Sequence, residues 1–282
     1  MHPLQDMCRR LPRGGGRNRE VNQMTRVTVN NMAVDVPEDA TVLQAVRAAG
    51  IELPTLCYHE GLSPYGACRL CMVSLTVPRR DLIASCIHPV EDGMVVETET
   101  PEAKAARRMV LELLLARCPN SGVIRDLAAQ MGVTASRFPA TATNGDDERC
   151  VLCGLCVRVC HEAIGAKAIG FIGRGEHRKV GSPFEIHSEA CIGCGACAEI
   201  CPTGAIIMED RGGVRLLSNW HTRIERYPCP DCGRYFAPEK MSFLKEMFSE
   251  IESLWTLCPE CRSKRTARQW LEQAGQKGIA LF

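Results

Sequence analysis

The sequence predicts an α+β chain built from several small domains rather than from one large core. The chain has 282 residues, and only 5% of them are aromatic, so a single core rich in Phe and Trp is not expected. It contains 18 cysteines, far above average usage, and most recur with two residues between neighbours. Alternating apolar residues near the N-terminus and helical periodicity further on indicate both strands and helices.

The composition restricts the cellular setting and the partners. Cysteines at two-residue spacing place thiols around a metal rather than across a fold, and thiolate sites imply a reducing compartment, which we take to be the cytoplasm. No run of about 18 apolar residues exists, so no insertion into a membrane is expected. The formal net charge is +1, which gives no reason to expect nucleic acid as a partner.

Residues 1–23 are expected to form a disordered tail. This stretch contains Arg9 and Arg10 and a run of three glycines, but no apolar segment follows the arginines. Neither an export signal nor a twin-arginine signal is therefore supported. Upstream residues before a true start near Met24 are the other interpretation.

Residues 24–99 are predicted to form a domain that begins with two strands and a helix. Valines alternate on both sides of Asn30 and Asn31, which is typical of a β-hairpin. A short helix is expected from Thr41 to Val46, and Gly50 is a left-handed C-terminal cap signal. A small β-grasp domain begins in this way.

Four cysteines follow in this domain with the spacing C-x10-C-x2-C-x14-C. They are Cys57, Cys68, Cys71 and Cys86. Four thiolates suit a [2Fe–2S] rhomb, which needs two for each iron. Four buried cysteines or a structural zinc site are the alternatives, but the long first spacing is unusual for zinc and the β-grasp context favours the rhomb.

The segment 100–140 is predicted to be a short helical linker. Thr100 is a suitable N-cap and Pro101 suits the first helical position. The apolar stripe expected on this helix consists of Val110, Leu113 and Leu114. A second helix is expected over 123–131.

Two cysteine runs of identical spacing dominate residues 141–212. In each run three cysteines are two residues apart and a fourth follows after three residues. The runs are Cys150, Cys153, Cys156, Cys160 and Cys191, Cys194, Cys197, Cys201. This is the ferredoxin spacing for a pair of [4Fe–4S] clusters, in which the fourth cysteine of each run ligates the other cluster.

This spacing predicts two ligand sets. The first is Cys150, Cys153, Cys156 and Cys201, and the second is Cys191, Cys194, Cys197 and Cys160. His161 follows the first run where Pro202 follows the second, and it is expected to be a surface residue. Glycines between the runs are typical of small strands and turns that wrap the clusters.

Residues 213–282 carry a different pattern, two C-x-x-C pairs with twenty-five residues between them. The pairs are Cys229, Cys232 and Cys258, Cys261. Such knuckles are typical of a ribbon-like zinc site, and four thiolates leave no open position, so the zinc would be structural. A further iron–sulfur cluster and a metal-free pair of redox thiols are the alternatives. Helices are expected over 238–255 and 266–273.

The segments around the twelve predicted cluster ligands resemble one family. The segments are Leu53–His59, Gly66–Cys71, Ser85–Cys86, Cys150–Cys160 and Cys191–Gly204. They are similar to the N-terminal region of the large iron–sulfur subunit of complex I. They equally resemble the diaphorase iron–sulfur subunit of NAD-reducing hydrogenases and the N-terminal region of NAD-linked formate dehydrogenases. The resemblance covers residues 26–210 and does not extend to the C-terminal knuckles.

One cluster that the resemblance implies has no ligands here. In that family the helix after the [2Fe–2S] domain leads to a [4Fe–4S] cluster held by one histidine and three cysteines. The corresponding loop, Ala116–Ser121, offers only Cys118. Cys118 is therefore expected to be a buried structural thiol. The expected cofactors are one [2Fe–2S] cluster, two [4Fe–4S] clusters and one zinc ion.

The chain is predicted to be an iron–sulfur electron-transfer subunit of a multisubunit cytoplasmic oxidoreductase. No dinucleotide-binding glycine motif, P-loop or nucleophile–base constellation occurs, so no active site of its own is expected. The resemblance implies two partners, a flavin- and NAD(H)-binding subunit and a catalytic subunit such as a hydrogenase, a formate dehydrogenase or another low-potential reductase. A diaphorase and a redox-sensing or assembly module are the alternatives, and the direction of electron flow and electron bifurcation stay open.

Overall fold

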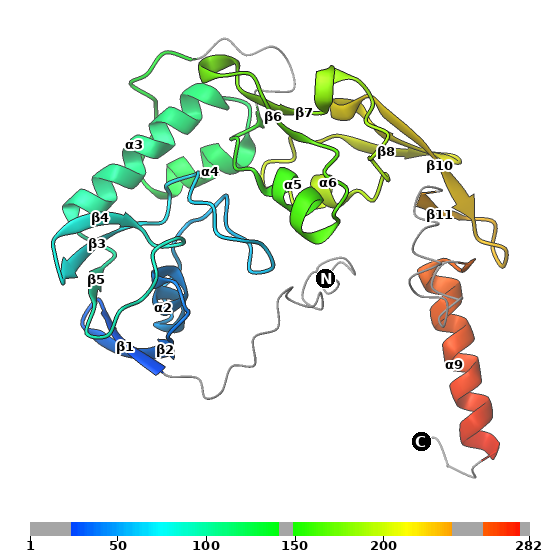
Figure 1. The fold of residues 1–282 in the computed structure, drawn as a ribbon, viewed down its shortest axis with the longest axis horizontal. Coiled ribbons are helices and arrows are strands. Elements are labelled where there is room, and N and C mark those ends of the chain that lie inside the picture. Colours follow the sequence, from blue (N-terminus) through cyan, green and yellow to red (C-terminus); the bar gives the residue numbers. More distant parts are fainter. Residues whose placement is uncertain (1–23, 141–148, 239–255, 277–282) are drawn as a thin grey trace. The chain divides into compact units, whose positions relative to one another are not determined.

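The computed structural model describes residues 24–140, 149–238 and 256–276, and Figure 1 shows its elements. The chain divides into two compact units. The first consists of Met1–Gly165, Gly170–Val180 and Cys197–Ala205, and the second of Ala166–Ile169, Gly181–Ala196 and Ile206–Phe282. None of the described helices has the length and apolar character that a membrane span requires.

A five-stranded mixed sheet opens the first unit. Its strands are β1 (Met24–Val29), β2 (Met32–Pro37), β3 (Met72–Val77), β4 (Asp81–Ala84) and β5 (Val95–Glu97), in the order β2-β1-β5-β3-β4. β1 pairs antiparallel with β2 and parallel with β5, and β3 pairs antiparallel with β5 and β4. The predicted opening is confirmed, because helix α2 (Val42–Ala48) follows β2.

The turn between β1 and β2 depends on its two asparagines. Asn30 and Asn31 have φ angles of 45° and 66°, in the left-handed region that asparagine tolerates better than most residues. The turn sets the register that pairs Val27 with Val34. Val27 and Val29 are fully buried as a result, and they share one core with the apolar side of α2.

Two helices follow the sheet, α3 (Pro101–Arg117) and α4 (Gly122–Gln130). Thr100 is the N-cap of α3, as predicted, because its Oγ1 accepts a hydrogen bond of 3.1 Å from the backbone N–H of Ala103. Helix α4 matches the second predicted helix within one residue at each end.

The buried side of α3 differs from the predicted apolar stripe. Leu111 is fully buried, whereas Leu113 is 47% exposed, so the prediction for Leu113 is wrong. The buried positions Ala103, Arg107 and Leu111 are four residues apart. Arg107 orients this face, because its Nη2 donates to the carbonyl oxygen of Thr98 at 2.7 Å. A buried guanidinium, which apolar periodicity does not count, therefore decides which side of α3 faces inward.

Short elements surround the two cysteine runs. They are α5 (Leu155–Arg158), the π-helix η2 (Val159–Ala163), β6 (Gly170–Ile172), the 3₁₀ helix η3 (Gly175–His177), β7 (Lys179–Gly181), the 3₁₀ helix η4 (Pro183–Glu185) and α6 (Ala196–Glu199). β6 and β7 form a two-stranded sheet. Small strands and turns therefore occur in this region, as the glycine-rich sequence predicts.

A four-stranded antiparallel sheet lies in the second unit, in the order β11-β10-β9-β8. Its elements are β8 (Met208–Arg211), β9 (Val214–Leu217), the 3₁₀ helix η5 (Ser218–Trp220), β10 (Thr222–Pro228) and β11 (Tyr235–Pro238). The β8–β9 hairpin turns at Gly212, the last residue of the predicted domain 141–212.

Helix α9 (Pro259–Gln276) is longer than the helix predicted over 266–273. It begins earlier because Pro259 is pre-shaped for a first helical turn. The predicted helix over 238–255 lies, apart from Pro238 at the end of β11, outside the described residues.

Replacing the N-cap of α3 should destabilise the first unit measurably. In Thr100→Ala the N–H of Ala103 loses its acceptor, so the free energy of unfolding should fall by about 1 kcal/mol. Thr100→Ser keeps a hydroxyl oxygen at this position and should retain most of the stability. Denaturation followed by circular dichroism compares the three proteins, and equal losses in both variants would show that the methyl group matters rather than the cap.

Candidate metal centres

Four buried cysteines meet beside β3 and β4. Cys71 directly precedes β3 and Cys86 follows β4, whereas Cys57 and Cys68 bracket a loop of ten residues. All four side chains are at most 6% exposed. Backbone N–H groups donate to two of the sulfurs, Cys68 N to Cys57 Sγ and Leu56 N to Cys68 Sγ, each at 3.4 Å. Such N–H groups favour thiolates and tune a bound cluster.

The ionisation of these four thiols is linked. The pKa of Cys57 is lowered, first by a hydrogen bond from the Cys68 thiol and then by one from Cys86. A hydrogen bond from Cys86 also lowers the pKa of Cys71 to about 6. The pKa values of Cys68 and Cys86 are raised, because their ionisation would break these bonds. Four buried sulfurs within reach of one another fit the predicted [2Fe–2S] site.

The first four-cysteine run bends at a left-handed glycine. Gly154 has a φ angle of 73° and separates Cys153 from α5, which carries Cys156. Burial raises the pKa of Cys153 to about 12 and also raises that of Cys156. The neighbouring thiols of Cys150 and Cys201 raise both values further, so the structure brings Cys201 near the first run, as the first predicted ligand set needs.

The C-terminal end of α3 holds the carbonyl group of Cys150. Arg117 Nε and Cys118 Sγ both donate to this oxygen at 3.2 Å, and Arg117 Nη2 donates to the carbonyl oxygen of Arg178 at 3.2 Å. Cys118 is fully buried, so the prediction of a buried thiol is confirmed. The loop without cluster ligands therefore supports the first run through hydrogen bonds.

The first part of the second four-cysteine run, around Gly193 and Gly195, lies against the four-stranded sheet. Gly193 and Gly195 have φ angles of 65° and 81°. A Cβ atom on them would lie 2.8 Å from Ile224 Cδ1 and 2.7 Å from the sulfur of Met208. The left-handed conformation therefore favours glycine at both positions, and a Cβ atom there would also displace the ends of these two side chains. Arg215 Nη1 donates to the carbonyl oxygen of Gly193 at 2.9 Å.

The second predicted ligand set is not tested by this geometry, because its members are divided between the two compact units. The set is Cys191, Cys194, Cys197 and Cys160, and it stays a prediction. His161, which follows Cys160, is exposed, as expected for a surface residue.

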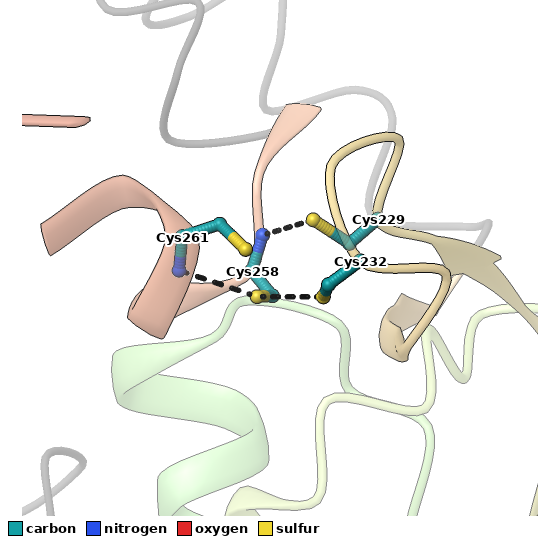
Figure 2. Close-up of side chains that lie close together, drawn as sticks. All are labelled: Cys229, Cys232, Cys258 and Cys261. Atoms are coloured by element: carbon teal, nitrogen blue, oxygen red, sulfur yellow. Dashed lines mark hydrogen bonds between the residues drawn. The ribbon is translucent and has the colours of Figure 1, made fainter. Parts of the chain in front are cut away.

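The two C-terminal cysteine pairs come together beside the start of α9 (Figure 2). Their four sulfur atoms all lie within 4.8 Å of one another. The atoms belong to Cys229, Cys232, Cys258 and Cys261. The sulfurs of Cys232 and Cys258 are 3.7 Å apart. Zn–S bonds of about 2.3 Å would place tetrahedral ligands about 3.8 Å apart, so these thiols fit a single ion.

Backbone groups prepare the C-terminal pairs for a metal. The N–H of Cys258 donates to Cys229 Sγ at 3.4 Å, and this bond is the largest cause that lowers the pKa of Cys229 to about 6. The N–H of Cys261 donates to Cys258 Sγ at 3.5 Å (Figure 2). Cys229 and Cys258 are buried with Leu257, and Phe236 packs against this small core.

Sequence reasoning missed three arginines that hold the cysteine loops. Each donates to a main-chain carbonyl oxygen in or beside a ligand run. The pairs are Arg117–Cys150, Arg158–Cys57 and Arg215–Gly193. Arg158 could have been noticed from its place between two predicted ligands, but the other two arginines carry no local signal.

Two family models match the chain. Residues 22–101 match the 2Fe-2S iron-sulfur cluster binding domain, and residues 149–205 match the 4Fe-4S dicluster domain. The matched segments contain all twelve cysteines predicted to hold the three clusters.

Similar proteins belong to NADH-oxidising enzymes. The NADH-ubiquinone oxidoreductase 75 kDa subunit of Reclinomonas americana is 34% identical over 205 residues, which are 65% of this chain and 29% of that protein. The mitochondrial NADH dehydrogenase [ubiquinone] iron-sulfur protein 1 of Solanum tuberosum is 33% identical over 225 residues, which are 71% and 30% of the two chains. The chain therefore spans less than a third of these relatives.

One solved structure is matched over a larger share of its length than these relatives are. A chain in the crystal structure of the NAD⁺-reducing [NiFe]-hydrogenase in the H₂-reduced state is 31% identical, with a TM-score of 0.51, and the match covers 56% of this chain and 74% of that one. Together with the two domain matches, it confirms the resemblance that the cysteine motifs indicate. The chain belongs to the family of iron–sulfur electron-transfer proteins that includes the NADH-ubiquinone oxidoreductase 75 kDa subunit and this chain of the NAD⁺-reducing [NiFe]-hydrogenase.

Proposed function

We propose that this chain relays electrons between a flavin- and NAD(H)-binding subunit and a catalytic subunit of a cytoplasmic oxidoreductase. The catalytic subunit would be a hydrogenase, a formate dehydrogenase or another low-potential reductase. The names of the relatives, which pair NADH with ubiquinone or NAD⁺ with hydrogenase, support an NAD(H)-linked complex. The bound clusters supply the electron-carrying chemistry, and the protein supplies their placement and their electrostatic surroundings.

The segment from Cys57 to Cys68, here called the [2Fe–2S] loop, packs on the first four-cysteine run within one compact unit. This packing is the observation that carries the proposal. Arg158 of that run donates to the carbonyl oxygen of Cys57 at 2.5 Å. Cys57 also lies near enough to Cys153 to affect its pKa. Electrons tunnel efficiently only across short gaps, so this packing allows exchange without a cluster at the Cys118 loop.

We assign one structural zinc ion to the C-terminal pairs as part of this proposal. The 3.7 Å between the sulfurs of Cys232 and Cys258 suits ligands of one ion. A four-iron cluster has iron and sulfide atoms between its thiolates and holds them further apart. Four thiolates also leave no open position for a substrate.

The metal content tests the proposed relay directly. The anaerobically purified chain should contain about ten iron atoms and about one zinc ion. Reduced protein should give one [2Fe–2S] signal and two interacting [4Fe–4S] signals in low-temperature EPR. About fourteen irons would contradict the three-cluster assignment, and about six would contradict the presence of two [4Fe–4S] clusters.

The EPR signals of the clusters also distinguish an electron-relay role of this chain from a redox-sensing role. In the purified native complex, NADH should reduce the clusters reversibly within one turnover. Reduction slower than turnover would favour a redox-sensing or assembly role for this chain.

A pair of serine variants tests whether Cys118 binds iron. Cys118→Ser should keep the full iron content, because this thiol donates to a carbonyl oxygen and a hydroxyl can do the same. Cys153→Ser should lose about four irons, since it removes a predicted ligand of one [4Fe–4S] cluster. Iron analysis compares them, and an equal loss in both would make Cys118 a ligand.

Removal of one knuckle thiol should release zinc alone. In Cys232→Ser the zinc content should fall from about one ion to near zero, because a structural site needs all four ligands. The iron content should stay unchanged, with Cys118→Ser as the control that keeps both metals. Loss of iron in place of zinc would show that these pairs hold an iron centre.

A further inference from the structure

One buried side chain connects the [2Fe–2S] loop to the first four-cysteine run. Arg158 lies between Cys156 and Cys160 and is 9% exposed. Its Nη2 donates to the carbonyl oxygen of Cys57, which is 101 positions earlier in the chain, and its Nη1 donates to the carbonyl oxygen of Ser63. Both acceptors belong to the segment from Cys57 to Cys68, which carries the first two predicted [2Fe–2S] ligands.

The same turn of the first run holds this segment from a second side. Glu162 Oε2 accepts a hydrogen bond of 2.7 Å from the backbone N–H of Ser63. The Arg158 guanidinium carbon lies 5.4 Å from the centre of the Tyr65 ring, a cation–π distance. Tyr65 in turn stacks on Phe171 of β6, with ring centres 6.3 Å apart. Arg158 and Glu162 therefore pair with both main-chain polar groups of Ser63, its carbonyl oxygen and its N–H.

The position of Gly154 is part of this contact. A Cβ atom there would lie 3.2 Å from the rings of both Tyr65 and Phe171. The left-handed φ angle of Gly154 already disfavours a side chain, and the two rings leave little room for one. A side chain at position 154 would therefore have to displace Tyr65 or Phe171.

The charge of Arg158 has no carboxylate to balance it among the described ion pairs. Its hydrogen-bond acceptors are neutral carbonyl groups, and its Nε–H, also buried, has no partner among the described residues. A buried cation costs free energy unless negative charge lies nearby. Thiolates of the predicted ligands, Cys57 of the contacted loop and Cys156 and Cys160 of the run that carries Arg158, would supply that charge once clusters are bound.

We infer that Arg158 is a positioning residue that fixes the [2Fe–2S] loop on the first four-cysteine run and raises the reduction potential of both neighbouring clusters. The inference rests on the proposed function, since it uses the predicted ligand sets. One-electron reduction adds a negative charge to a cluster without making or breaking a bond. A buried cation stabilises the reduced form more than the oxidised form, so its loss makes both clusters harder to reduce.

Two variants of the full chain separate the effect of the Arg158 charge from the effect of its hydrogen bonds to the loop. Arg158→Met removes the charge and keeps most of the volume, and both midpoint potentials should fall by the equivalent of a tenfold change in the reduction equilibrium, about 59 mV for one electron. Arg158→Lys keeps the charge but cannot hold two carbonyl groups at once. It should restore most of the potential while the amides from Cys57 to Cys68 exchange hydrogen faster. EPR-monitored redox titration and hydrogen exchange give the two readouts.

Arg149 offers the matched control. It precedes the predicted ligand Cys150 and is exposed, so solvent screens its charge. Arg149→Met removes the same charge near the same cluster and should leave both potentials and the exchange of the loop unchanged.

The outcomes are distinguishable. Potentials and loop exchange that match the wild type in both Arg158 variants, with full iron content, would overturn the inference. Equal shifts in Arg149→Met would also overturn it, because burial would not matter. If Arg158→Met loses iron, the test is the hydrogen exchange of the amides from Cys57 to Cys68 in Arg158→Lys. Exchange at the wild-type rate in that variant would show that Arg158 does not fix the loop. A wild-type chain that holds no clusters would refute the proposed function itself.

Discussion

Main-chain carbonyl groups in the cysteine loops need hydrogen-bond donors, and guanidinium groups supply them. When the N–H groups of a ligand loop point toward sulfur atoms, the carbonyl groups of the same loop are directed elsewhere and must be paired if buried. The pairs are Arg158–Cys57, Arg117–Cys150 and Arg215–Gly193. Arginine suits this task because its charge is permanent, it has several donors, and its charge opposes that of the thiolates. The ligand loops therefore depend on side chains from other parts of the chain.

How far the sequence predicts this structure depends on whether the deciding contacts are local. The turn at Asn30 and the cap at Thr100 are set by neighbouring residues, and both were predicted correctly. The cysteine runs could also be recognised, because metal geometry imposes a spacing on ligands, and two cluster-binding domain models match the segments that contain them. Leu113 was misplaced because Arg107 orients its helix through a contact with a main-chain oxygen. Such oxygens carry no sequence signature, and for that reason the three loop-holding arginines were missed as well.

Within the second unit, strand β10 of the four-stranded sheet connects the second cysteine run to the C-terminal pairs. Ile224 of β10 packs against Gly193 in the second cysteine run. The same strand ends at Pro228, directly before Cys229 of the C-terminal pairs. A metal held by those pairs would restrain β10 and β11 at one end, and Ile224 of β10 contacts the cysteine run further along. Metal binding by the C-terminal pairs would then also stabilise the neighbouring segment around Gly193.

The separation of the two C-terminal pairs has an entropic consequence. A single ion that joins Cys232 to Cys258 closes a loop of twenty-five intervening residues. The entropy lost on closing a loop grows only with the logarithm of its length, so doubling this one would cost about 0.6 kcal/mol. Within each pair, by contrast, two intervening residues fix the angle at which both sulfurs reach the ion. In entropic terms alone the length of this loop therefore matters little, whereas a single residue added inside either pair would change the angle between its two sulfurs.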